Sequence, residues 1–91
     1  MKNFIENKCY EVVRQCKYYD YCKEDLLKAV GYIDVNTADS LVRKAVKFRD
    51  AKERCEQTFT LVRQFVWATE NEEYMQMWDD IVEGYLEKKW A

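Results

Sequence analysis

The sequence predicts an all-α protein, a small helical bundle of three long helices and one short helix that forms a single domain over residues 1–91. The 91 residues include two glycines and no prolines, so turns are few and the helices must be long. Hydrophobic residues make up 48% of the chain and charged residues 35%, which is the composition of a folded protein rather than a disordered one. Apolar residues also recur every three or four positions, the period of a helix that packs on one face.

The first predicted helix covers about residues 2–18. A corner is expected over residues 18–22, where tyrosines cluster and Asp20 is a suitable N-cap for the next element. A short helix over about residues 23–30 then ends at Gly31, a residue type that fits the left-handed position after a helix. The apolar stripe of the first helix consists of Ile5, Cys9, Val12, Val13, Cys16 and Tyr19.

A long central helix is predicted over about residues 37–68. Asn36 or Thr37 is a suitable N-cap, and no helix-breaking residue follows for more than thirty positions. Lys52 interrupts the apolar stripe, and Ala51 is expected to take the core position in its place. The stripe itself consists of Leu41, Ala45, Phe48, Cys55, Phe59, Val62 and Val66.

The last helix is predicted to begin at Thr69, because Thr69-x-x-Glu72 matches a capping box. The central helix would be about 48 Å long, and the first and last helices, about 25 Å and about 28 Å long, would each cover half of it. Two packed helices bury little surface, so either the central helix breaks near Thr58 and Thr60 to form a compact monomer, or a second copy covers it. We expect self-association into a homodimer or another homo-oligomer. The apolar face of the last helix consists of Tyr74, Met77, Trp78, Ile81, Val82, Tyr85 and Trp90.

The residue types argue against an enzyme. The chain has no histidine, so it has no Ser-His or Cys-His pair and lacks the commonest general base near neutral pH. No glycine-rich loop is present to bind a phosphate, and the acidic last helix has Gln76 where a magnesium site would need a further acid. The four cysteines form no C-x-x-C pair that could start a zinc site. We expect no catalytic residue, no cofactor and no metal.

The N-terminus and the apolar runs predict a cytoplasmic protein. Charged residues occur from Lys2 onward, unlike the start of a signal peptide. No apolar run approaches the roughly 18–20 residues of a membrane span. We therefore expect reduced cysteines and no membrane partner.

Three sets of residues are candidates for binding. Large aromatic residues of the last two helices are of the types that dominate protein–protein contacts, namely Trp67, Tyr74, Trp78 and Trp90. Basic residues of the central helix could contact the phosphates of a nucleic acid, namely Arg43, Lys44 and Lys47. The tyrosines of the predicted corner could stack on a base or nucleotide, namely Tyr18, Tyr19 and Tyr21.

We expect a non-enzymatic protein that binds another protein, as a small inhibitor or adaptor does. Small helical chains rich in aromatic residues are typical of the accessory proteins of phages and mobile elements. A nucleic-acid-binding protein that uses the basic face of the central helix is the first alternative. A sensor of a small ligand such as a nucleotide, bound at the tyrosine corner, is the second.

Overall fold

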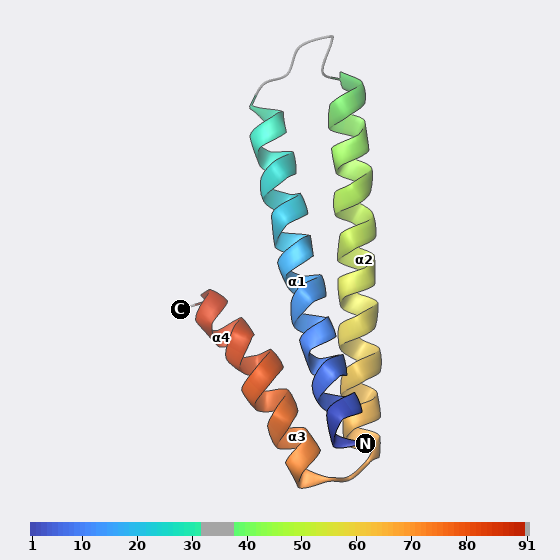
Figure 1. Ribbon diagram of the computed structural model, residues 1–91. Helices are drawn as coiled ribbons and strands as arrows, with labels where there is room; N and C mark the ends of the chain where they lie inside the picture. The colour runs from blue at the N-terminus through green and yellow to red at the C-terminus, as the bar shows by residue number, and fades with distance from the viewer. Residues whose placement is uncertain (32–37, 91) are drawn as a thin grey trace.

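The computed structural model describes residues 1–31 and 38–90, the last of these by its backbone only, and these residues are arranged as a long helical hairpin with a further helix against one half of it (Figure 1). The hairpin consists of α1 (Lys2–Val30) and α2 (Ala38–Ala68). After a short turn come α3 (Glu72–Trp78), the π-helical turn η2 (Asp79–Glu83) and α4 (Gly84–Trp90), which we call together the C-terminal helix. The described residues contain no strand, and the predicted all-α class is confirmed.

The first helix is longer than the sequence predicted. The corner over residues 18–22 and the separate short helix over residues 23–30 are wrong, because α1 runs without a break to Val30. No glycine or proline lies within this range, so the clustered tyrosines have nothing that forces a turn. Cys22 continues the buried stripe with 5% of its surface exposed. Gly31 is right-handed, with φ of −71°, and is not the left-handed residue that was predicted.

The central helix is confirmed as one long element. α2 extends unbroken from Ala38 to Ala68, so the break considered near Thr58 and Thr60 is absent. Ala51 is 3% exposed and takes the core position beside the exposed Lys52, as predicted. The predicted N-caps at residues 36 and 37 lie outside the described residues.

α1 packs antiparallel to α2 along nearly its whole length. Ring contacts join Phe4 to Phe65 near one end, with centroids 5.7 Å apart, and Tyr19 to Phe48 further along, with centroids 5.3 Å apart. The Lys44–Asp25 ion pair, at 3.0 Å, joins the helices beyond that point. The radius of gyration is 16.4 Å, compared with about 12 Å expected for a compact chain of this length. The molecule is therefore a rod, with extents of 55 × 24 × 16 Å.

The N-cap of the C-terminal helix is Asn71, two residues after Thr69, the predicted N-cap. The Asn71 side-chain oxygen accepts hydrogen bonds from the backbone N–H groups of Glu73 and Tyr74, at 2.9 and 3.2 Å. Thr69 instead ends α2, because its hydroxyl donates to the carbonyl of Val66 at 2.6 Å. Glu70 between them has φ of 53°, and this left-handed residue reverses the chain.

We expect the Asn71→Ala substitution to lower the free energy of unfolding by about 1 kcal/mol, because two backbone N–H groups lose their acceptor. Urea unfolding followed by circular dichroism measures the change. Asn7→Ala is the control, since Asn7 is exposed within α1 and caps no helix. Equal stability of the two variants would contradict the role of the cap.

The core lies where the three helices meet, in the half of the rod that holds the N-terminus (Figure 1). The tip, defined as residues 21–31 and 38–51, extends past the C-terminal helix and has only Cys22 and Ala51 buried among its described residues. Hydrophobic burial is therefore concentrated at one end of the molecule. The largest fully buried side chains are Trp78, Ile5, Val12, Val66, Val82 and Cys9.

The far end of the C-terminal helix is attached to α1 at Asp20. One carboxylate oxygen of Asp20 accepts from Lys89 Nζ at 2.6 Å, and the other accepts from the Tyr85 hydroxyl at 3.4 Å. The hydrogen bond to Asp20 raises the pKa of the Lys89 ammonium. Asp20 thus joins two helices and is not the N-cap that was predicted for it.

Candidate functional site

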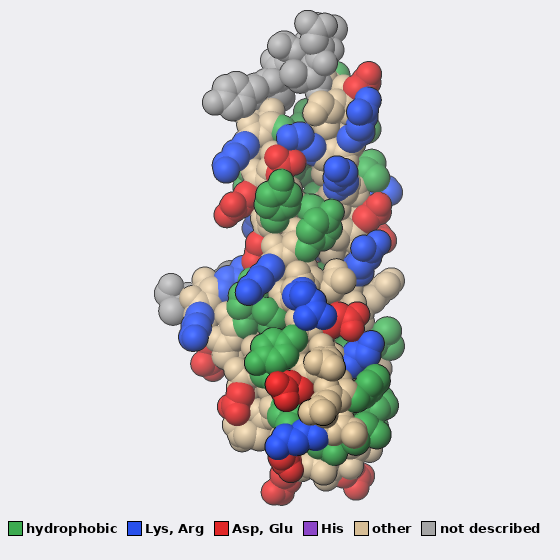
Figure 2. Space-filling model, in the orientation of Figure 1, with side chains coloured by type: hydrophobic (Ala, Val, Ile, Leu, Met, Phe, Trp, Pro, Cys, Tyr) green, Lys and Arg blue, Asp and Glu red, His purple; other side chains and the backbone are tan. Residues whose placement is uncertain are grey.

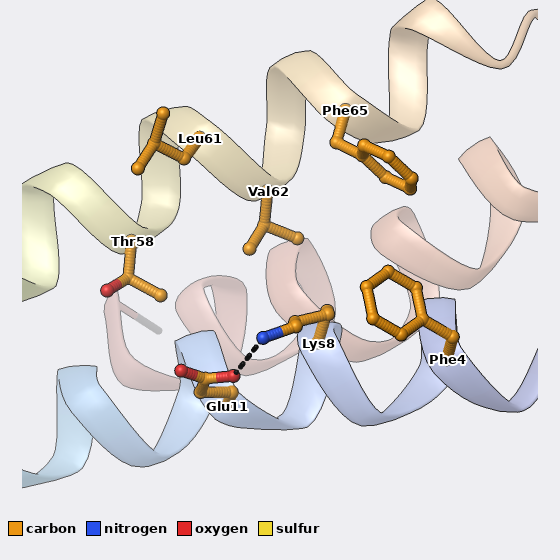
Figure 3. A pocket seen from close by; sticks show the side chains of 7 residues that line it. All are labelled: Phe4, Lys8, Glu11, Thr58, Leu61, Val62 and Phe65. Atoms are coloured by element: carbon orange, nitrogen blue, oxygen red, sulfur yellow. Dashed lines mark hydrogen bonds and ion pairs between the residues drawn. The ribbon is translucent and has the colours of Figure 1, made fainter.

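A groove lined largely by apolar side chains lies between α1 and α2 (Figure 3). It has a volume of about 270 Å³ and opens on the face of the hairpin away from the C-terminal helix, which runs behind it in this view. Three large apolar side chains lie in the groove with much of their surface in water: Phe4 is 48% exposed, Leu61 65% and Phe65 43%. The residues of this α1–α2 groove are Phe4, Lys8 and Glu11 from α1 and Thr58, Leu61, Val62 and Phe65 from α2.

Helical spacing brings the groove residues together. The α1 residues are separated by four and three positions, and those of α2 by three, one and three, so each set occupies one side of its helix. Phe4 and Phe65 meet edge to face and close one end of the groove. Lys8 donates to Glu11 at 3.2 Å, and its ammonium also lies 5.6 Å from the centre of the Phe4 ring. The charges on the α1 side therefore balance each other, and the rest of the groove presents apolar surface.

The groove was not predicted from the sequence. Phe4, Leu61 and Phe65 each lie one position before a residue of the buried stripes. Residues beside the stripes were not assigned a function from the sequence. A second apolar row on α2, formed by Leu61 and Phe65 four positions apart, was the available signal. In the structure, α1 and the C-terminal helix pack against the buried stripe of α2, and the second row, Leu61 and Phe65, stays exposed.

The aromatic residues predicted to bind a protein do not share a surface. Trp78 is fully buried, so this prediction is corrected: the ring is part of the core and donates from Nε1 to Glu83 at 3.2 Å. Tyr74 is half-buried against the same core. Trp67 is 39% exposed, with Arg63 stacked 5.3 Å from its ring and Trp78 at 6.2 Å on its edge. The Trp90 side chain lies outside the described residues.

The basic residues predicted to contact nucleic acid lie on the tip. Arg43 and Lys47 are exposed and four positions apart, so they share a side of α2. Lys44 is half-buried, and its ammonium is paired with Asp25 of α1. Figure 2 shows basic side chains interspersed with acidic ones over the visible face of the tip. The three residues therefore do not form one continuous basic surface.

The tyrosines predicted to form a stacking platform are separated by the helical geometry of α1. Tyr18 and Tyr21 are 46% and 66% exposed, whereas Tyr19 packs against Phe48 with nearly parallel rings, 27° apart. Lys89 also approaches the Tyr19 ring, at 5.9 Å. The three rings do not form one platform, because the continuous helix turns Tyr19 toward α2 and leaves Tyr18 and Tyr21 in solvent; stacking of a base on these two rings stays a prediction.

Comparisons with protein-family models, with curated proteins and with solved structures find no match for this chain. Over residues 1–31 and 38–90, no helix is long and apolar enough to cross a membrane. The same part of the chain has no group of three or more cysteine, aspartate or glutamate side chains placed to hold a metal ion.

Proposed function

We propose that this chain is a non-enzymatic protein that binds another protein, as an inhibitor or adaptor does, and that the α1–α2 groove is its contact surface. The observation that carries the proposal is the gathering of Phe4, Leu61 and Phe65 in one hollow while each is between 43% and 65% exposed. Clustered exposed apolar surface of this kind is typical of protein-binding sites.

The shape of the groove favours an amphipathic helix of the partner as its occupant. The two walls are antiparallel helices, and the groove between them is lined by residues 4–11 of α1 and 58–65 of α2 (Figure 3). The opposite face of the same hairpin already holds a helix, the C-terminal one, whose apolar residues contact both α1 and α2. A partner helix with apolar residues three and four positions apart would occupy the open face in the same manner.

Leu61→Asp tests the groove, and Leu27→Asp is its matched control. The two leucines are exposed to almost the same extent, 65% and 62%, but Leu27 lies on the tip. A partner is first captured from a nuclease-treated lysate, and its affinity is then measured by titration calorimetry against the wild type and both variants. We expect Leu61→Asp to weaken binding about ten- to hundred-fold, the value of one buried leucine of about 1.5–3 kcal/mol. We expect Leu27→Asp to bind the partner as the wild type does, whatever its effect on self-association, because Leu27 does not line the groove.

Two results would contradict the groove as the contact surface. One is equal affinity of the Leu61→Asp variant and the wild type, and the other is a loss of binding confined to Leu27→Asp. Circular dichroism of both variants verifies that the helices remain folded. If nuclease abolishes all capture, the nucleic-acid alternative takes precedence, and substitution of Arg43 and Lys47 becomes the next test.

We also propose self-association through the tip. The C-terminal helix does not reach this part of the hairpin (Figure 1), and aliphatic side chains there are exposed to solvent. Leu27 and Val30 of α1 are 62% and 48% exposed, and Val42 and Val46 of α2 are 62% and 40% exposed. A second copy that covered these side chains would supply the burial that the tip lacks. Light scattering after size exclusion measures the mass in solution. A dimer that Leu27→Asp dissociates supports this proposal, and a monomeric wild type contradicts it.

A further inference from the structure

Two cysteine side chains from different helices meet within the hairpin. Cys16 Sγ of α1 and Cys55 Sγ of α2 are 3.3 Å apart, and both thiols are free. They are 39 positions apart in sequence, so only the pairing of the two helices brings them together. Cys9 and Cys22, the other two cysteines, are both buried. Among the four cysteines, all of which lie in the described part of the chain, Cys16 and Cys55 are the pair whose sulfurs are in contact.

The pair is accessible from outside. Cys16 is 6% exposed and Cys55 is half-buried, and both line a hollow of about 340 Å³. The hollow lies beside α4, which contributes Leu86 and Lys89 to its wall. A small oxidant can reach the sulfur of Cys55 through this opening. Cys9, by contrast, has none of its surface exposed.

We propose that Cys16 and Cys55 are a redox-active dithiol that a hydroperoxide converts into a disulfide between α1 and α2. The thiolate of one cysteine attacks the outer oxygen of the hydroperoxide, the O–O bond breaks, and a sulfenic acid and an alcohol, or water, are formed. The second sulfur then attacks the sulfenic sulfur, the S–S bond forms, and the S–O oxygen leaves as water. The two sulfurs lose two electrons, and the hydroperoxide gains them.

The geometry of the pair suits the second step. A disulfide bond is about 2.0 Å long, so the sulfurs need to approach by only about 1.3 Å from their present separation of 3.3 Å. The surroundings of Cys55 set the pH dependence of the first step. Burial first, and then the hydrogen bond with Cys16, raise the pKa of the Cys55 thiol to about 12; the nearby Asp20 adds to this rise, and Lys89 opposes it. The Cys55 thiolate is therefore scarce near neutral pH, and oxidation of Cys55 should accelerate as the pH rises.

The test uses the whole folded protein treated with hydrogen peroxide. After the remaining thiols are alkylated, digestion and mass spectrometry identify which cysteines are linked. We expect a peptide pair joined through Cys16 and Cys55, lighter by two hydrogen atoms, and alkylated Cys9 and Cys22. Dithiothreitol should restore four alkylated cysteines.

Serine variants provide the controls. Cys16→Ser and Cys55→Ser should each abolish the cross-link, whereas the double variant Cys9→Ser, Cys22→Ser should keep it. Circular dichroism before and after treatment verifies that the linked protein is folded. A link that involves Cys9 or Cys22, a link between two copies of the chain, or full alkylation of Cys16 and Cys55 after peroxide treatment would overturn the proposal.

Discussion

Replacement of Trp78 by alanine is expected to lower the free energy of unfolding by about 3–5 kcal/mol, the range for large aromatic residues in a core. The side chain is fully buried and contacts Phe59 and Trp67 edge to face, with ring centroids 5.1 and 6.2 Å away. Its indole N–H also donates to Glu83, so the substitution removes a hydrogen bond as well as the packing. Because small domains are stable by only about 5–15 kcal/mol, the variant should be close to unfolding at room temperature.

Urea unfolding followed by the helical circular dichroism signal measures this effect, and Trp67→Ala is the matched control. Trp67 belongs to the same aromatic cluster but is 39% exposed, so its loss should cost less than half as much. Trp78→Phe should fall between the two, since it keeps a ring against Phe59 but loses the bond to Glu83 and part of the buried volume of the indole. Equal destabilisation by Trp78→Ala and Trp67→Ala would show that the core is not centred on Trp78.

A carboxylate in place of Val66 should have a comparable effect, because Val66 is fully buried at the end of α2 where the three helices meet. We expect Val66→Asp to lower the free energy of unfolding by at least about 4 kcal/mol. Leu61→Asp is the control in the same helix: Leu61 is 65% exposed and lies outside the tip, and its substitution should change stability by about 0.5 kcal/mol or less. Thermal unfolding of both variants is the measurement.

The pH dependence of the Val66→Asp variant identifies the cause of its instability. Burial raises the pKa of a carboxyl in the folded state above the ordinary value of about 3.9. The folded state then binds a proton more tightly than the unfolded chain, so the deficit relative to the wild type should grow as pH rises through about 4. If the loss of unfolding free energy relative to the wild type is the same at roughly pH 3.5 and pH 7, its cause is steric disruption and not the buried charge.

The pattern of apolar residues predicted most of the fold and failed where two signals competed. α2 was predicted almost to its ends because no residue between Ala38 and Ala68 breaks a helix. The corner at residues 18–22 was predicted from an aromatic cluster, yet tyrosines form helices readily when their rings find partners, as Tyr19 does on Phe48. Thr69 and Asn71 are both residue types that cap helices well, so the sequence did not decide between them. In the structure Glu70 takes a left-handed conformation and Asn71 becomes the N-cap.

The candidate site depends on three-dimensional facts that periodicity does not contain. Residue types indicated that aromatic side chains would be involved in binding, but burial decides which of them are available. Trp78 is buried, and so unavailable for binding, because the C-terminal helix packs on one face of the hairpin and places this side chain in the core. Phe4 and Phe65 remain exposed because that helix leaves the opposite face uncovered (Figure 3). Which face is covered follows from the turn after α2, and nothing in the spacing of the residues determines it.

The unequal distribution of burial along the rod has a consequence for how each end can recognise a partner. The half that holds the core is stabilised by three helices, so its groove is preorganised and a ligand meets a surface of fixed shape. The tip is held by Cys22, Ala51 and contacts between only two helices, and it can open locally at a lower cost than global unfolding. Binding at the groove therefore resembles a lock-and-key encounter, whereas binding at the tip can proceed by induced fit.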